Sequence, residues 1–127
     1  NGKFSKVVKV PNQISYKNLL TNTIMLTSTI MIDLKQINKE LLKMPELRIS
    51  EDTQTWLNIL KNGNISYGLD EELAQYRKRR QSTSSNKIKT TISIWKVYRE
   101  YQLFGIFKSS YYTFMYLFNA IRKRAKI

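Results

Sequence analysis

Two adjacent carboxylates, Glu51 and Asp52, are the residues of this chain whose type and setting best suit acid–base chemistry. They open a stretch whose apolar residues recur at helical spacing, so they fall on a first helical turn, where the helix macrodipole favours negative charge. A carboxylate anchored on a rigid element can take a proton from a hydroxyl group in a cleft. The plain alternative is an acidic helix start without chemistry, and spacing alone favours this alternative.

The helix that carries these carboxylates has a predicted beginning and end. Ser50 is the expected N-cap, because its hydroxyl can accept a hydrogen bond from an unpaired backbone N–H. Gly63 supplies a C-terminal stop, which predicts a helix over residues 51–62. Trp56 lies one turn after Asp52 on the same face. The apolar stripe consists of Trp56, Leu57, Ile59 and Leu60.

A second signature occupies Glu72–Lys87, where a run of basic residues beginning at Arg77 precedes a polar loop. With the Glu51–Leu57 segment it resembles the C-terminal half of a bacterial family 2 glycosyltransferase, an enzyme of the GT-A fold that builds capsule, exopolysaccharide and lipopolysaccharide glycans. The order and spacing of the pieces carry the resemblance, which covers nearly the whole chain. Its other pieces are Val10-Pro11, Ile14–Tyr16, Leu19-Leu20, Thr27–Asp33, Tyr67–Leu69 and Trp95–Arg99.

The resemblance implies a reaction and a general base. Enzymes of this kind transfer a sugar from a nucleotide-sugar donor to a hydroxyl of a glycan or lipid-linked acceptor, with inversion at the anomeric carbon. Asp52 matches the position of the general base, and Glu51 is the supporting carboxylate beside it. A sugar hydroxyl is a poor nucleophile until such a carboxylate takes its proton.

Two further residues receive expected roles from the same resemblance. Arg77 falls in the region that closes the donor site, so it is the candidate contact to the donor diphosphate. The basic residues that follow it, 78–80, fit a solvated loop equally well. Trp56 packs either on the acceptor side of the site or in the core.

The resemblance also implies a missing partner half. Family 2 enzymes bind the nucleotide through an N-terminal α/β half that ends in an Asp-x-Asp metal motif, whereas Asp33 and Asp70 stand isolated in this sequence. We therefore expect residues 1–86 to form the acceptor-side half of a GT-A catalytic domain, inactive alone. A divalent metal, Mg²⁺ or Mn²⁺, is expected for the complete enzyme, with its ligands outside this chain and no metal bound by this chain alone.

Composition narrows the chemistry and suggests other partners. The 127 residues include no cysteine and no histidine, which removes thiol chemistry and the commonest general base. The net charge is +13, and residues 71–127 hold thirteen basic residues against three acidic ones. Such a field attracts diphosphates, anionic membranes or nucleic acid, so a basic membrane-surface or nucleic-acid-binding module without catalysis is the alternative function. The acidic helix start and the lack of a recognisable motif argue against nucleic acid.

The sequence predicts a helix-rich α/β fold with a few short strands. We expect an edge strand at Val7–Val10, a buried strand at Ile24–Ile32 and a short strand at Ile65–Tyr67. Helices are expected at Ser15–Thr21, Leu34–Lys43 and 51–62, and a polar loop at Gln81–Asn86.

Residues 87–127 are expected to form an amphipathic extension of two helices with a break near Gly105. The segment Phe104–Ile121 is apolar and aromatic, but it is too polar and too short to span a membrane. Residues 104–127 could instead lie on an anionic membrane or pack on the protein body. We expect a cytoplasmic enzyme. The membrane alternative would make it peripheral on the inner face of the plasma membrane.

Overall fold

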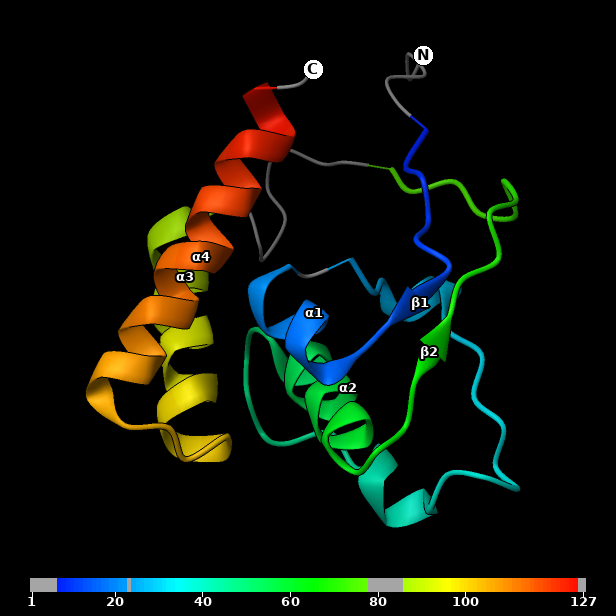
Figure 1. Ribbon diagram of the computed structural model, residues 1–127, viewed down its shortest axis with the longest axis horizontal. Helices are drawn as coiled ribbons and strands as arrows, with labels where there is room; N and C mark the ends of the chain where they lie inside the picture. Colours follow the sequence, from blue (N-terminus) through cyan, green and yellow to red (C-terminus); the bar gives the residue numbers. More distant parts are fainter. Residues whose placement is uncertain (1–6, 23, 78–85, 126–127) are drawn as a thin grey trace.

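The computed structural model describes residues 7–22, 24–77 and 86–125 (Figure 1). The prediction of a helix-rich chain with a few short strands and two C-terminal helices is confirmed. The elements, in chain order, are β1 (Gln13–Ile14), α1 (Tyr16–Thr21), the 3₁₀ turns η1 (Thr27–Thr29) and η2 (Lys39–Leu42), α2 (Glu51–Lys61), β2 (Ser66–Tyr67), α3 (Lys87–Lys96), the π-helical turn η4 (Val97–Tyr101) and α4 (Ile106–Ala125).

Helix α2 lies at the centre of the core. Its apolar stripe is buried as the spacing predicts, and Leu57 is fully buried. Burying a leucine side chain stabilises a fold by about 1.5–3 kcal/mol, so this stripe is a main source of stability. Gly63, at φ 86°, ends the helix and donates its N–H to the Leu60 carbonyl, as predicted. The core consists of Ile14, Leu19, Leu20, Trp56, Leu57, Ile59, Leu60, Ile94, Val97 and Tyr98.

Helix α1 is short and begins with a complete capping box. The Ser15 hydroxyl accepts from the Asn18 N–H, and the Asn18 side chain accepts from the Ser15 N–H at 3.0 Å. Two otherwise unpaired donors are thereby satisfied, which fixes where the helix starts. Leu19 and Leu20 then face the core. The predicted helix at 15–21 is confirmed.

A small antiparallel sheet joins the N-terminal segment to the chain that follows α2. Gln13 pairs with Tyr67 and Ile14 with Ser66. The predicted strand near 65–67 is therefore confirmed. The edge strand predicted at 7–10 is wrong, because these residues are exposed and the pairing begins beyond Pro11, which has no N–H to donate. Asp70 instead holds this segment, accepting the Val10 N–H at 3.1 Å.

Residues 24–43 depart most from the sequence prediction. The buried strand at 24–32 is wrong: the Thr29 hydroxyl and the backbone close a 3₁₀ turn onto the Leu26 and Thr27 carbonyls, and Met31 is 98% exposed. The helix at 34–43 is also wrong, except for the turn η2. Asp33 accepts from the Lys35 N–H at 2.9 Å and from the Gln36 side chain at 3.0 Å. This local bonding competes with helix formation at its start.

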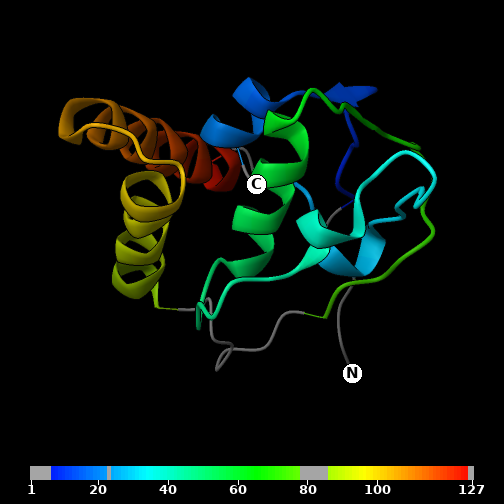
Figure 2. The ribbon, with the colours of Figure 1, turned by 90° about the horizontal axis from the view of Figure 1, so that it is seen from below.

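Helices α3 and α4 pack against each other on one side of the molecule, and η2 lies on the other side (Figures 1 and 2). The π-turn η4 ends α3, and the chain reverses through Leu103, at φ 57°, and Gly105. The predicted break near Gly105 is confirmed. The polar loop predicted at 81–86 lies outside the described residues except for Asn86, which caps α3. The division at residues 86 and 87 stays a prediction.

The two-helix unit is joined to the core by buried polar contacts. The Tyr98 hydroxyl donates to the Leu20 carbonyl at 2.6 Å. Tyr16 donates to the Gln102 side-chain oxygen at 2.6 Å, and Gln102 donates to the Gln54 side-chain oxygen at 2.9 Å. Because buried polar groups are costly when unpaired, these bonds specify how α1, α2 and the end of η4 fit together.

Gly68 is the glycine whose replacement this fold tolerates least. A Cβ there would overlap the Pro11 carbonyl oxygen and Val10 Cγ1, whereas a Cβ at Gly105 meets open space. We expect Gly68→Ala to lower the free energy of unfolding by about 1–3 kcal/mol and Gly105→Ala to change it by less than about 1 kcal/mol. Urea denaturation measures both. Equal effects of the two substitutions would contradict this packing.

Alkaline pH should unfold the protein through its buried tyrosines. Burial, with a smaller contribution from Tyr112, raises the pKa of Tyr16 to about 12. Burial likewise raises the pKa of Tyr98. Tyrosines of the unfolded chain lose their protons near pH 10, so the free energy of unfolding should fall from pH 10 to about 12. Urea denaturation from pH 8 to 12 should show this fall, and Tyr16→Phe should reduce its slope. A flat profile would contradict it.

Candidate active site

Asp52 lies on the first turn of α2, where both of its carboxylate oxygens are held. The Thr27 hydroxyl of η1 donates to Oδ2 at 3.0 Å. The Thr53 backbone N–H donates to Oδ1 at 2.7 Å. The Thr53 hydroxyl also donates to Oδ1, at 3.4 Å, so Oδ1 already accepts two hydrogen bonds. Oδ2 accepts one and keeps capacity for another hydroxyl. The carboxylate is therefore oriented but not saturated.

The chain enters α2 in a strained conformation. Ser50 adopts φ 68° and ψ 16°, the left-handed region, and its side chain makes no capping hydrogen bond. Ser50 is the N-cap residue, as predicted, but the predicted hydrogen bond to its hydroxyl is wrong. A left-handed residue cannot turn its hydroxyl onto the first-turn N–H groups as an extended N-cap does. The Asp52 carboxylate accepts a first-turn N–H instead.

Helix α3 also fixes this entry. The Ser93 hydroxyl donates to the Ile49 carbonyl, one residue before the left-handed turn, at 2.5 Å. Two segments far apart in the sequence, η1 and α3, thus contact the chain on either side of the start of α2. Their hydrogen bonds set the position of the Asp52 carboxylate.

Glu51 and Trp56 share the helix with Asp52 but lie in different surroundings. Glu51 is half-buried on the same first turn, and its backbone carbonyl accepts from the Thr55 hydroxyl at 2.9 Å. Trp56 is 5% exposed and belongs to the core. Its indole N–H is buried without a hydrogen-bond partner in the part of the chain that the structure describes. A buried donor without an acceptor costs about 1–3 kcal/mol.

Arg77 lies on a different segment of the chain from the acidic pair. It is exposed, in the extended segment that follows β2. Residues 78–80, the rest of the basic run, lie outside the described residues. A role for Arg77 at a donor diphosphate stays a prediction.

The described residues do not fit a divalent metal. Among residues 7–22, 24–77 and 86–125, no three or more His, Cys, Asp and Glu side chains are grouped so that they could hold a metal ion. Divalent cations of this kind need several oxygen ligands in one place. No step is therefore assigned to a metal here.

The contribution of Thr27 is the feature of this site that the sequence does not reveal. Its segment has the Ile, Met and Thr content of a strand, and nothing in its spacing relates it to Asp52, which lies twenty-five residues later. The contact arises because residues 24–32 form an exposed turn beside α2 rather than a strand. No periodic signal could have indicated this.

Comparison with known proteins identifies two glycosyltransferases as relatives. The chain is 39% identical over 119 residues to TuaG of Bacillus subtilis, named as a teichuronic acid biosynthesis glycosyltransferase; the match covers 94% of this chain and 46% of TuaG. It is 29% identical over 126 residues to an uncharacterized glycosyltransferase of Haemophilus influenzae, covering 98% of this chain and 49% of that protein. The chain thus spans about half the length of the curated relatives it matches.

Two other comparisons find no match. No family profile matches the chain, and no solved structure matches it. The relationship to glycosyltransferases therefore stands on the two sequence matches, both of which cover nearly all of this chain.

The start of α2 provides a direct test of which residue caps it. We expect Asp52→Ala to lower the free energy of unfolding by about 1 kcal/mol, because it removes an N-terminal acceptor and a charge that the helix dipole favours. Ser50→Ala should have almost no effect. Ser50→Gly should raise stability by about 1 kcal/mol, because glycine adopts the left-handed conformation without strain. Urea denaturation of the three variants measures this; a Ser50→Ala loss as large as that of Asp52→Ala would contradict it.

Proposed function

We propose that this chain is the acceptor-side, C-terminal half of an inverting family 2 enzyme of the GT-A fold. The premise is that it matches about half the length of two bacterial glycosyltransferases. The observation that carries the proposal is the Asp52 carboxylate. Thr27 and Thr53 orient it on a rigid helix, and its Oδ2 can accept one more hydrogen bond. These are the requirements for a general base.

In this proposal Asp52 removes the proton from the acceptor hydroxyl. The hydroxyl oxygen forms a bond to the anomeric carbon of the donor sugar as the bond from that carbon to the diphosphate oxygen breaks. The nucleoside diphosphate leaves with the electron pair, Asp52 becomes a carboxylic acid, and the anomeric configuration inverts. Thr27 keeps the carboxylate aimed, because rotation of Asp52 would cost the 3.0 Å hydrogen bond to Oδ2.

Positively charged groups would stabilise the leaving nucleoside diphosphate. The developing negative charge on a diphosphate must be met by cations or hydrogen-bond donors. Arg77, exposed after β2, is the proposed contact from this chain. We assign the nucleotide site and any divalent metal ligands to the other half of the complete protein.

The proposed product is a cell-surface polysaccharide. TuaG carries teichuronic acid biosynthesis in its name, which supports a nucleotide-sugar donor and a glycan or lipid-linked acceptor for this chain as well. Capsule, exopolysaccharide and lipopolysaccharide are further products of the same class. A lipid-linked acceptor would place the enzyme in the cytoplasm, peripheral on the inner face of the plasma membrane.

Asp52→Asn in the complete protein tests the proposed base. Asparagine can keep the contacts to Thr27 and Thr53 but cannot take a proton, so we expect kcat to fall about 100-fold to 10,000-fold while the donor KM changes little. A sugar-transfer assay with a range of nucleotide-sugars and cell-extract acceptors provides the rates.

Asp33→Asn is the matched control. Asp33 also accepts two hydrogen bonds, from Lys35 and Gln36, but it only shapes a turn. Its kcat should stay within about twofold of wild type. The 127-residue chain alone should transfer no sugar. Near-normal transfer by Asp52→Asn, or transfer by the isolated chain, would contradict the proposal.

A further inference from the structure

Helix α4 turns one row of large aromatic side chains away from the protein. Phe107 is 92% exposed and Phe114 is 65% exposed. We call the exposed row along this helix the outer stripe. With 3.6 residues per turn and 1.5 Å rise, its members fall within an arc of about 80° over a length of about 21 Å. They are Phe107, Tyr111, Phe114, Phe118 and Ile121.

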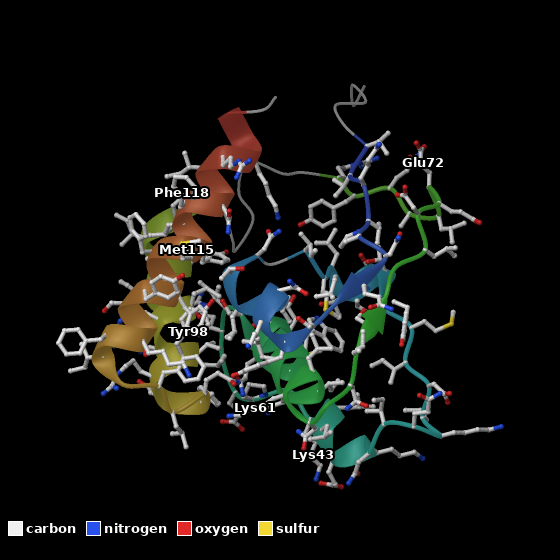
Figure 3. All side chains as sticks on the ribbon, viewed as in Figure 1. Lys43, Lys61, Glu72, Tyr98, Met115 and Phe118 are labelled. Atoms are coloured by element: carbon white, nitrogen blue, oxygen red, sulfur yellow. The ribbon has the colours of Figure 1, made fainter. Side chains whose placement is uncertain are left out.

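The opposite face of α4 makes the contacts with the body. Ser109 is fully buried, and the Asn119 amide donates to the Thr21 carbonyl at 2.9 Å. Tyr112 and Tyr116 also pack against the hydrophobic core. Phe118, by contrast, lies on the side of α4 that faces away from α1 and α2 (Figure 3). The outer stripe therefore contributes little to packing on the core. An exposed apolar surface of this size marks an interaction site.

The C-terminal part of the chain, which carries the outer stripe, is strongly basic. Residues 87–127 include nine Lys and Arg residues and one acidic residue, Glu100. Lys108 and Arg122 are exposed on α4 near the two ends of the stripe, and at 3.6 residues per turn they lie on one flank of it. Lys and Arg can reach an anionic surface with their charged ends while their stems lie along apolar contacts.

We propose that the outer stripe docks α4, lying in the interfacial plane, on an anionic phospholipid bilayer, with Lys108 and Arg122 at the headgroups. An aromatic face beside cations suits the boundary between acyl chains and negatively charged headgroups. Docking of a second copy of this chain would bring two positively charged helices together, and these would repel each other. An anionic lipid surface attracts the same helix, so charge favours lipid as the partner. No described helix is long and apolar enough to cross a membrane. The inference extends the proposed location at the inner membrane face and does not depend on the proposed chemistry.

Vesicle flotation of the 127-residue chain tests the docking surface. The wild type should float with phosphatidylcholine vesicles that contain about one-third phosphatidylglycerol, and weakly or not at all with phosphatidylcholine alone. Phe107→Ser/Phe114→Ser/Phe118→Ser should weaken binding by about tenfold or more. Met31→Ser/Leu69→Ser/Leu73→Ser, which removes three exposed apolar side chains outside α4, should bind as the wild type does.

Two double charge-reversal variants distinguish attraction of the bilayer to the cations beside the outer stripe from attraction to the net charge of the whole chain. Lys108→Glu/Arg122→Glu should weaken binding to the anionic vesicles by about tenfold or more. Lys35→Glu/Lys39→Glu, on the exposed chain around η2, lowers the net charge by the same amount and should change binding by less than about threefold.

Several results would overturn the proposal. They are equal flotation of the phenylalanine triple variant and the wild type, no flotation of the wild type, and equal losses in the two charge variants. Gel filtration that shows a dimer dissociated by the phenylalanine triple variant would assign the stripe to a second copy. Flotation of this chain but not of the complete protein would mean that the other half covers the stripe. None of these readouts requires sugar transfer, so they stand whether or not Asp52 is a base.

Discussion

The burial of α2 is the constraint on which the rest of this structure depends. Leu57 and Leu60 fill the core from this helix, and α1, α3 and η4 pack around them. The same helix carries Asp52 at its first turn. Because residues of α2 are buried around a full turn, the helix cannot move without opening the core, and the carboxylate is anchored on a buried element. The hydrogen bond from Gln102 to Gln54 then fixes the two C-terminal helices to that element.

The start of α2 shows how local strain and long-range contacts combine at the candidate site. Ser50 holds a left-handed conformation that costs about 1–2 kcal/mol, and Ser93 and Thr27 bond to the chain on either side of it. Strain of this kind persists only where the surroundings fix it, and it gathers at functional sites. The arrangement supports a carboxylate positioned for chemistry over an ordinary acidic helix start.

The sequence predicts the elements whose signals are local. Apolar residues at helical spacing and Gly63 locate α2, Ser15 and Asn18 locate α1, and Gly105 locates the break between the last two helices. The sequence prediction fails where side chains bond to residues close by in the chain. Asp33 accepts from Lys35 and Gln36, and the Thr29 hydroxyl donates to the Leu26 carbonyl, in turns where a helix and a strand are predicted. The sequence prediction places Asp52 on the correct turn but misses Thr27, because their contact depends on tertiary packing. The serine before the acidic pair is the N-cap residue, yet its left-handed backbone conformation leaves its side chain without a capping hydrogen bond.

We propose that Asp52 meets the acceptor hydroxyl in the complete enzyme. A crystal structure of the complete protein with a nucleoside diphosphate and an acceptor sugar bound tests this directly. We expect an acceptor hydroxyl within about 2.6–3.2 Å of an Asp52 carboxylate oxygen, with the Thr27 contact kept. An acceptor bound away from the start of α2, with another carboxylate at its hydroxyl, would show that Asp52 is not the base.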